Sequence, residues 1–461
     1  TSTLFRWNKM MIKNRGELLA HGVERGRHVA LDIIEHALKS VDPYQATKRV
    51  VQRQNNRLFI DNQPYNLNDV KNLYVIGAGK ASFSIAKALE DVLGDRITRG
   101  VVIVKRGQDG RLKKIKKIEA GHPLPDEDGL RGAEEVMEIA DEAERGDLVF
   151  AVITGGSSAL MPLPVEGITL EETREVNELL LHSGAVIQEI NAVRKHISKI
   201  KGGRLALHIH PAEIINLTVS DVIGDWKMLD YITGNTVPDS STFQDAINSL
   251  KKYRLLEKIP EAVRSHLQNA CPEMETPKNF RKIKVHTVIL ATNEDACIAA
   301  AKRAEVLGFN TMILSTRIEG ESREVGIIHA GIAKEIEVNN RPIKTPCVLV
   351  SGGETTVTIE GNHGEGGPNQ EFVLGFATKI KGSKRIIGVS IDTDGTDGPT
   401  NVAGGIADGL TLKRAEAVNL DIHESLMYHN TYSVLKSLGD TIYTGSTGTN
   451  VMNLRLIIVS E

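Results

Sequence analysis

Cysteine and long apolar runs are both scarce in this 461-residue chain. The three cysteines, Cys271, Cys297 and Cys347, lie far apart and match neither a paired extracellular framework nor the ligand spacing of a zinc site. We therefore expect reduced thiols, a cytoplasmic location and no catalytic zinc. The longest apolar runs, such as 147–154, have the length of a strand and fall short of the ~20 residues of a membrane helix, so no membrane span is predicted.

An excess of one charge is also missing. The 56 Lys and Arg residues nearly balance the 59 Asp and Glu residues, so the chain has no overall field that would attract nucleic acid or an anionic membrane. Nucleic acid is therefore not an expected partner, and any affinity for phosphate must be local. The hydrophobic share of 41% is that of a globular protein, and the length predicts at least two domains. The first ten residues do not read as a secretory signal.

Strand-like runs alternate with helical patterns, which predicts an α/β protein with a mainly parallel sheet. We expect two α/β domains, a Rossmann-like N-terminal domain (1–282) and a second, mixed-sheet domain (283–461). In the first we expect helices at 26–39, 83–93, 129–143 and across 169–207, and strands at 72–76, 100–105, 148–154 and 213–219. In the second we expect strands at 285–290, 311–314, 347–351, 386–391 and 454–459, helices at 295–307 and 326–338, and a hairpin around 354–359.

Glycine-rich turns follow most of these strands, at the edge where open α/β sheets bind ligands. The turn 77–82 places backbone N–H groups at the start of a helix and adds the charge of Lys80, a combination that suits phosphate or carboxylate. A tight turn with an exposed lysine explains the same residues about equally well, because the phosphate-loop pattern is absent and Ser82 replaces the third dinucleotide glycine.

Two further segments of the N-terminal half carry groups that could bind an anion. The turn 154–159 offers Ser157 and Ser158, although a helix N-cap is an equal alternative, and Ala159 spoils the pattern of a serine-hydrolase nucleophile. The basic segment 191–204 reads as one helix with a glycine cap. Charged runs are usually solvated faces, but Arg194 and Lys201, two turns apart, would share one face and could reach a cleft.

Carboxylates and hydroxyls dominate the other turns. The segments 220–225 and 392–397 end strands with clustered aspartates, which suit Mg²⁺, while a plain turn is the alternative. A calcium loop is disfavoured at 392–403 because Ala403 stands where the bidentate glutamate belongs. The turns 351–356, 361–371 and 444–450 are rich in glycine, hydroxyls and amides, which suit a polyphosphate and sugar hydroxyls.

Ten motifs in order extend the comparison to a known family: NLYVIGAGKAS, AGHPLPDEDG, TGGSSALMPLPVEGITLEE, INAVRKHISKIKGGRLA, SDVIGD, VPDSSTF, SGGETTVTI, GGPNQEF, DTDGTDGPT and TGSTGTNV. Together they resemble the class II glycerate 2-kinases that carry a C-terminal MOFRL region. The resemblance implies ATP-dependent phosphorylation of the 2-hydroxyl of D-glycerate, giving 2-phosphoglycerate and ADP, with Mg²⁺ or another divalent cation. It also implies an active site in a cleft between two domains, and a homodimer is compatible with it.

The resemblance assigns Lys80 to the transferred phosphoryl group. We hypothesise that Asp221 orients or deprotonates the attacking hydroxyl, while Arg194 with Ser157, Ser158, Lys201 and Arg204 holds the substrate, and Asp392 and Asp394 hold the metal. The nucleotide is assigned to the turns that contain Gly77, Gly79, Gly352, Gly353, Glu354, Thr355, Asn369, Gln370, Gly448, Thr449 and Asn450.

Two positions depart from the family pattern. Pro368 replaces an arginine often found there, so that Arg194, Lys201 or Arg204 would have to supply the missing charge, and Asn453 replaces an aspartate.

Two rival functions remain open at this point. The first is an NAD-dependent hydroxy-acid oxidoreductase, against which Val104, Lys105 and Arg106 stand where a ribose-binding acid is needed. The second is a non-catalytic protein that binds a phosphorylated metabolite.

Overall fold

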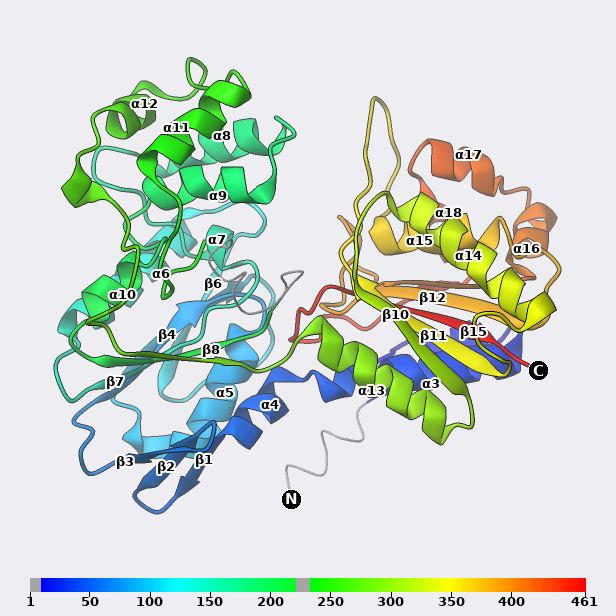
Figure 1. Ribbon diagram of the computed structural model, residues 1–461, viewed down its shortest axis with the longest axis horizontal. Coiled ribbons are helices and arrows are strands. Elements are labelled where there is room, and N and C mark those ends of the chain that lie inside the picture. Colours follow the sequence, from blue (N-terminus) through cyan, green and yellow to red (C-terminus); the bar gives the residue numbers. More distant parts are fainter. Residues whose placement is uncertain (1–9, 221–232) are drawn as a thin grey trace. The chain divides into compact units, whose positions relative to one another are not determined.

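The computed structural model describes residues 10–220 and 233–461. Contacts between residues divide the chain into two units. The central unit comprises Pro43–Leu290, and the terminal unit comprises the described residues up to Asp42 together with Ala291–Glu461. Each unit contains a six-stranded sheet with helices on both faces (Figure 1), as the alternation of strand and helix patterns predicts.

The sheet of the central unit is entirely parallel, and its strand order is β6-β5-β4-β7-β8-β9. This order is that of a Rossmann sheet, with its switch point between β4 and β7, from which the chain builds outward in both directions. The expected Rossmann-like domain is thereby confirmed. The strands are β4 (Leu73–Ala78), β5 (Arg99–Lys105), β6 (Ile115–Ala120), β7 (Leu148–Ala151), β8 (Glu213–Thr218) and β9 (Val285–Ile289).

Helices cover both faces of this sheet (Figure 1). One face packs on α6 (Glu127–Glu142), α7 (Ser157–Leu160) and α10 (Arg204–Ile209), and the other lies under α5 (Ser82–Leu93), which α4 (Pro43–Val50) flanks. A separate cluster with its own apolar core consists of α8 (Leu170–Leu181), α9 (Ile187–His196), α11 (Phe243–Lys252) and α12 (Glu261–Gln268). A small antiparallel sheet contains β1 (Val51–Gln54), β2 (Arg57–Ile60) and β3 (Gln63–Asn66).

The sheet of the terminal unit is mixed, in the order β10-β11-β15-β12-β13-β14. Only β10 and β11 pair in parallel, because β15 enters between β11 and β12 in the opposite direction. The strands are β10 (Asn310–Ile318), β11 (Cys347–Gly353), β12 (Ile386–Asp392), β13 (Gly404–Asp408), β14 (Thr441–Ile442) and β15 (Asn453–Val459). The expected mixed-sheet domain is confirmed.

Two apolar cores sandwich the mixed sheet. One lies under α3 (Glu24–Ser40) and α13 (Asn293–Val306), with α2 (Arg15–Leu19) beside it. The other lies under α14 (Ser322–Asn339), α15 (Pro368–Ala377), α16 (Thr411–Ala417), α17 (Ile422–Met427) and α18 (Thr431–Ser437). Short 3-10 turns occur at Gly94–Arg96 and Pro272–Met274. No helix among the described residues is long and apolar enough to cross a membrane.

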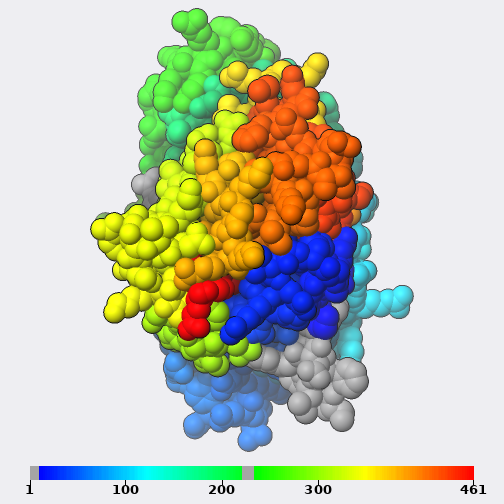
Figure 2. All heavy atoms as spheres, turned by 90° about the vertical axis from the view of Figure 1, so that its right-hand side faces the viewer, coloured from blue at the N-terminus to red at the C-terminus, as the bar shows by residue number. Residues whose placement is uncertain are grey.

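The N-terminal segment is built into the terminal unit, which differs from the boundary expected near residue 282. Apolar residues of α3 complete the core under β12 and β15, and Figure 2 shows this dark blue segment lying against the orange part of the chain near residue 400. The buried Arg27 donates hydrogen bonds to Asp408 (2.6 Å) and to Asp440 (2.8 Å). An amphipathic helix pattern shows that one face is buried but not which core buries it, so the sequence alone misplaced this helix.

Two smaller expectations are wrong. The strand at 285–290 does not begin the second sheet, because β9 pairs with β8 at the edge of the first. The hairpin around 354–359 is absent, since that described segment forms only an isolated bridge between Thr356 and Glu321. Strand pairing is set by distant partners, which the local pattern does not report.

The Arg27 ion pairs give the first prediction. Replacing Arg27 with Ala leaves two buried carboxylates without this cation, so we expect the free energy of unfolding to fall by about 3 kcal/mol or more. Arg25→Ala on the exposed face of the same helix is the control and should change it by less than about 0.5 kcal/mol. Denaturant unfolding followed by circular dichroism measures both, and equal effects would contradict the structural role of Arg27.

Candidate active site

The two glycine-rich turns of the central unit lie side by side at the switch point. They follow β4 and β7, which are paired in parallel. The backbone N–H of Lys80 donates to the carbonyl of Gly155 (2.9 Å), and that of Ala81 donates to the Thr154 hydroxyl (3.1 Å). Glycine is required at position 79, because φ is +136° and a Cβ atom would overlap Thr154. The two turns therefore form one interlocked backbone surface at the ligand-binding edge of the sheet.

This surface carries the features of an anion site. Helix α5 begins at Ser82 without a side-chain cap, so its positive end is directed toward the turn. Lys80 is half-buried, and a Cβ atom on Gly156 would lie 3.5 Å from its Cγ and 3.2 Å from the ring of His122. Lys80 and His122 therefore both border the second turn. The sequence predicted Lys80 but not His122, which comes from the turn after β6.

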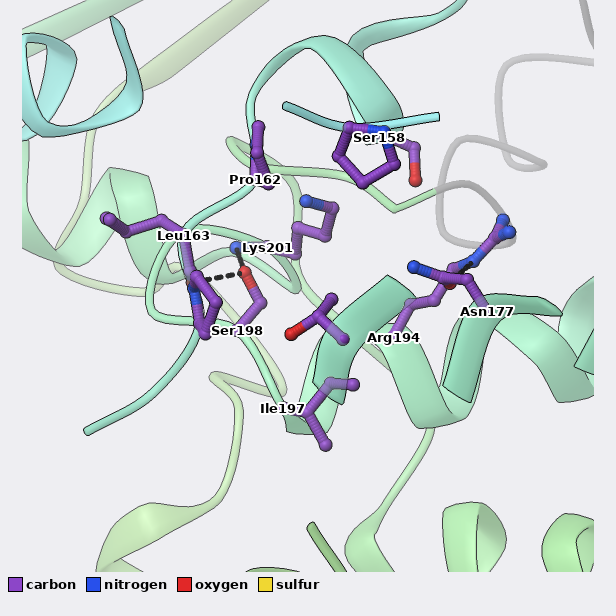
Figure 3. A pocket seen from close by; sticks show the side chains of 11 residues that line it. Ser158, Pro162, Leu163, Asn177, Arg194, Ile197, Ser198 and Lys201 are labelled. Atoms are coloured by element: carbon purple, nitrogen blue, oxygen red, sulfur yellow. Dashed lines mark hydrogen bonds between the residues drawn. The ribbon is translucent and has the colours of Figure 1, made fainter. Parts of the chain in front are cut away.

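A pocket beside these turns is lined by three of the five residues that were predicted to hold the substrate. Ser158, Arg194 and Lys201 line it together with Pro125, Pro162, Leu163, Pro164, Thr173, Asn177, Ile197 and Ser198, and Figure 3 shows the two cationic side chains on either side of the hollow. Its volume is about 20 Å³, on a scale where one water needs about 10–15 Å³. The pocket is thus large enough for a small polar group such as a carboxylate.

Neither cation in the pocket is paired with a described carboxylate. Arg194 Nε donates to the amide oxygen of Asn177 (2.7 Å), and the buried Lys201 Nζ donates to the carbonyl of Met161 (3.1 Å). Burial, together with the smaller effect of the nearby charge of Arg194, lowers the pKa of Lys201 to about 7. Two cations that are close enough to repel each other and that bond only to neutral oxygens form a site for an anion.

The reason the two cations meet differs from the one expected. Helix α9 ends at His196, so Arg194 and Lys201 do not share a helical face. The chain turns after the helix, and Lys201 reaches the pocket from that turn. A turn of this kind has no spacing rule in the sequence, so the expectation of proximity rested on a wrong local structure.

Other predicted residues of this unit lie elsewhere. Arg204 is absent from the pocket lining and bonds three backbone carbonyls, those of Lys195, Ser198 and Met274, at 2.5–3.0 Å. Ser157 is buried at the first position of α7, whereas its neighbour Ser158 lines the pocket. Asp221 lies outside the described residues. The assignment of substrate contact to Arg204 thus finds no support in its geometry, which is that of a structural clamp.

The predicted nucleotide turns of the terminal unit gather at one edge of its sheet. The antiparallel β15 starts where β11 and β12 end, so that Asn453 lies opposite both Gly353 and Asp392. The Thr447 hydroxyl donates to the carbonyl of Thr393 (2.6 Å), which ties the turn 444–452 to the turn 392–397. Thr449 is buried, and its hydroxyl has no hydrogen-bond partner among the described residues.

The start of α15 is already occupied by a carboxylate of the same unit. Asp397 accepts hydrogen bonds from the backbone and side-chain N–H groups of both Asn369 and Gln370, at 2.9–3.0 Å. Burial raises the pKa of Asp397, and these donors oppose the shift by stabilising the ionised form. Asn369 and Gln370, which were predicted to bind the nucleotide, thus donate these hydrogen bonds to a carboxylate of the protein itself. Asp397 was not among the predicted site residues, although the sequence placed it in the same aspartate-rich turn as Asp392 and Asp394.

Asp392 and Asp394 have the donor chemistry that suits Mg²⁺. Each places one carboxylate oxygen on the local turn: Asp392 Oδ1 accepts from the N–H of Asp394 (3.0 Å), and Asp394 Oδ1 accepts from Thr396. Within the described ranges no three His, Cys, Asp or Glu side chains converge as a metal site. Two carboxylates still fit an ion that takes its remaining ligands from nucleotide phosphates and water.

The terminal unit also contains a charged residue that sequence reasoning missed. Thr355 is buried and accepts hydrogen bonds from Ser322 Oγ and from Arg455 Nη2, both at 2.8 Å. Arg455 lies in the otherwise apolar run LRLIIV. The sequence pattern therefore predicted only a buried strand here and gave no sign of a functional charge. Only the three-dimensional contact with Thr355 connects it to the predicted nucleotide turn.

Comparisons with known proteins identify the family of this chain. Residues 29–268 match a domain of unknown function, DUF4147, and residues 347–453 match the MOFRL family. A protein of Pyrococcus horikoshii named glycerate 2-kinase is 43% identical over 94% of this chain and 98% of its own length. One of Thermotoga maritima named D-glycerate 2-kinase is 39% identical over 93% and 97%. This chain belongs to the glycerate kinase family that carries a MOFRL domain.

The architecture of that family is preserved. The crystal structure of a glycerate kinase from Thermotoga maritima superimposes with a TM-score of 0.81 at 37% identity, covering 95% of this chain and all of that one. One relative has a different kind of name: a protein of Agrobacterium vitis, 39% identical over 84% of this chain and 98% of its own length, is named for hydroxypyruvate reductase activity.

The pKa of Lys201 gives the second prediction. The folded state holds this pKa near 7, below the unfolded value of 10.5, so between these values the unfolded chain binds more protons. Stability should therefore increase with pH relative to Lys201→Met, by up to about 1.4 kcal/mol per pH unit above pH 7. Urea unfolding at pH 7, 8 and 9 tests this. Lys199→Met at an exposed position should show no such trend, and a flat difference for Lys201→Met would contradict the assignment.

Proposed function

We propose that this protein is a kinase that transfers the γ-phosphoryl group of ATP to the 2-hydroxyl of D-glycerate, giving 2-phosphoglycerate and ADP. The observation that carries the proposal is the pocket at the switch point, in which Arg194 and the buried Lys201 have only neutral partners among the described residues. Family membership supplies the reaction class, and the pocket supplies a place for a small carboxylate.

The glycerate carboxylate fits this pocket by charge and by size. Arg194 keeps guanidinium N–H groups for an anion after its bonds to Asn177 and Asn191, and a charged pair of this kind is stronger than a neutral hydrogen bond. Lys201 adds a second positive charge, and Ser158 adds a hydroxyl at the rim nearest the glycine turn.

Lys80 is the residue we assign to the transferred group. Phosphoryl transfer demands in-line alignment and neutralisation of charge on the equatorial oxygens, with little covalent chemistry from the protein. Lys80 is fixed through its backbone bond to Gly155 at the uncapped start of α5, so its ammonium group and the helix terminus act on the same region. Asp221 retains its proposed role in orienting the attacking hydroxyl.

The terminal unit is the proposed nucleotide-binding part. The turns at Gly352–Thr355 and Gly448–Asn450 meet at one sheet edge through the register of β15. Mg²⁺ would be held by Asp392 and Asp394, where it would neutralise phosphate charge. The three cysteines form no disulfide, which supports a reducing compartment such as the cytoplasm.

The oxidoreductase alternative is suggested by the name of the Agrobacterium vitis relative, and the central sheet argues against it. A dinucleotide-binding sheet places an acidic side chain at the end of its second strand to hold the ribose. Here the second strand, β5, ends at Lys105, and the next residue, Arg106, is paired with Asp126 and Asp128. A cationic strand end is unsuited to that contact with NAD.

The product identifies the activity directly. Purified protein incubated with D-glycerate and Mg-ATP should give the ³¹P resonance of 2-phosphoglycerate together with ADP. Addition of NAD and D-glycerate alone should give no absorbance of reduced nicotinamide. Nicotinamide reduction would favour the oxidoreductase, and binding of either substrate without turnover would favour a non-catalytic protein.

Removal of the Lys80 ammonium group should reduce kcat by roughly 10²-fold or more, because the charge acts on the transition state. The matched control is Lys87→Ala on α5, the helix that follows Lys80, where the lysine pairs with Asp91 in a partly exposed ion pair. Steady-state assay of ADP release measures both variants. Near-normal turnover of Lys80→Ala would remove the role assigned to this residue.

Arg194→Gln should act mainly on substrate binding. Loss of one charge-assisted contact predicts an increase of roughly 10- to 100-fold in KM for glycerate, while KM for ATP should change little. Arg131→Gln, at an exposed position of α6, should leave both constants unaltered. An increase confined to KM for ATP would show that the pocket does not hold glycerate.

A further inference from the structure

Arg455 is a fully buried cation at the centre of the mixed sheet. It lies on β15, opposite Ser351 of β11 and Ser390 of β12, and none of its surface is exposed. Its guanidinium carbon is 5.4 Å from the centroid of the Phe372 ring. A central strand position between two sheet neighbours and a helix is ordinarily occupied by an apolar residue, so the charge at this point needs an explanation.

The hydrogen bonds of Arg455 do not supply a structural explanation. Nη2 donates to the Thr355 hydroxyl at 2.8 Å, while Nε and Nη1 have no partner among the described residues. No described carboxylate lies within ion-pair distance of it, although the charges of Glu354, Asp397 and Asp392 act on it from farther away and oppose the effect of burial on its pKa. Burying a charge without pairing it is destabilising by several kcal/mol. The guanidinium therefore has two donors that the fold of this unit does not use.

Other arginines of the terminal unit show what a structural role looks like. Arg27 is equally buried but bonds two carboxylates, those of Asp408 and Asp440. Arg385 uses Nε, Nη1 and Nη2 on three acceptors, the carbonyls of Ser460 and Glu337 and the hydroxyl of Thr345. Arg455 matches neither pattern, because its one bond goes to a residue of the proposed nucleotide turn.

Thr355 connects this charge to the turn after β11. Its hydroxyl is held by Ser322, the first residue of α14, as well as by Arg455. The backbone around it is also fixed, since the N–H of Ser322 donates to the carbonyl of Thr356 (2.9 Å). Loss of Arg455 would leave Thr355 tied to α14 alone, without the link to the centre of the sheet.

The neighbouring histidine adds no second charge. His329 Nδ1 faces the carbonyl of Val325 (2.8 Å) and Nε2 faces Ser351 Oγ (3.0 Å). Burial lowers the pKa of His329 to about 4, and the charge of Arg455 contributes to that shift. His329 is thus neutral near pH 7, and the positive charge beneath Ser351–Thr355 on this face of the sheet comes from Arg455.

We propose that Arg455 is a positioning residue for the phosphate groups of the bound nucleotide. It fixes Thr355 through Nη2, and its charge, which Glu354, Asp397 and Asp392 compensate only in part, is balanced further when a polyphosphate binds at the turn 351–355. The inference rests on the proposed function in so far as the polyanion is a nucleotide. Arg455 would therefore destabilise the protein in the absence of nucleotide and strengthen the binding of nucleotide.

The test compares Arg455→Met and Arg455→Lys with wild type, by calorimetric titration of ADP and by melting temperature without nucleotide. We expect Arg455→Met to bind ADP at least about 10-fold more weakly and to melt at or above the wild-type temperature without ligand. Arg455→Lys, which keeps the charge but not the fork, should be intermediate. KM for ATP should increase in both variants, while KM for glycerate stays within about twofold.

Two further variants keep the test decisive if Arg455→Met does not fold. Thr355→Val removes the acceptor of Nη2 and should weaken ADP binding, with a non-additive effect when combined with Arg455→Lys. Arg385→Met is the matched control for a satisfied arginine and should lower the melting temperature without altering ADP affinity. Unchanged ADP affinity of the Arg455 variants, or additive effects with Thr355→Val, would overturn the inference.

The wild-type arm separates this inference from the proposed function. Wild type that binds ADP but forms no 2-phosphoglycerate would contradict the glycerate kinase proposal, and the Arg455 variants would still test the nucleotide contact. Wild type that forms product while the Arg455 variants bind ADP normally would contradict the role of Arg455 alone. Wild type that binds no nucleotide would overturn both.

Discussion

Buried positive charge that forms no ion pair among the described residues is the constraint on which the candidate sites of both units depend. In the central unit it is carried by Lys201 beside Arg194, and in the terminal unit by Arg455. A buried cation is stable only when something compensates it. Each of these cations lies next to turns that offer further donors, so the compensation is best supplied by an anionic ligand. Phosphorylation of a small carboxylic acid by a nucleotide involves two such ligands, a carboxylate and a polyphosphate.

The same units show how a buried charge is treated when it serves the fold. Arg27 joins the N-terminal helix to Asp408 and Asp440, Lys195 pairs with Asp239 at 2.9 Å, and Asp397 receives four donors at the start of α15. These groups are matched within the chain and need no ligand. The contrast separates structural charges from functional ones by their partners, since burial alone is common to both.

Local sequence patterns predicted the strands and turns that carry the site, whereas contacts between residues distant in sequence were missed. A strand followed by a glycine turn and a helix can be recognised in ten residues, so the turns at Gly77 and Thr154 and the two α/β sheets were predicted correctly. The attachment of α3 to the terminal unit, the pairing of β9 with β8 and the bond from Arg455 to Thr355 depend on residues about 70 to 400 positions apart. Arg194 and Lys201 illustrate the limit, because their proximity was predicted from a helix that ends before Lys201.

The titration of Lys201 makes anion binding in the pocket lined by Arg194 and Lys201 depend on pH. With its pKa near 7, the ammonium form is only partly populated in the empty pocket at neutral pH. A carboxylate bound beside it would favour the charged form and raise this pKa, since an opposite charge stabilises the ammonium. Glycerate binding would therefore take up a fraction of a proton, and its affinity would fall as pH rises above 7. The energetic reason is the one that applies to Arg455: each cation is kept poorly compensated in the free protein, so that the arrival of an anion supplies the missing interaction. Binding energy is then concentrated on the charge of the substrate, which distinguishes a hydroxy acid from a neutral polyol of the same size.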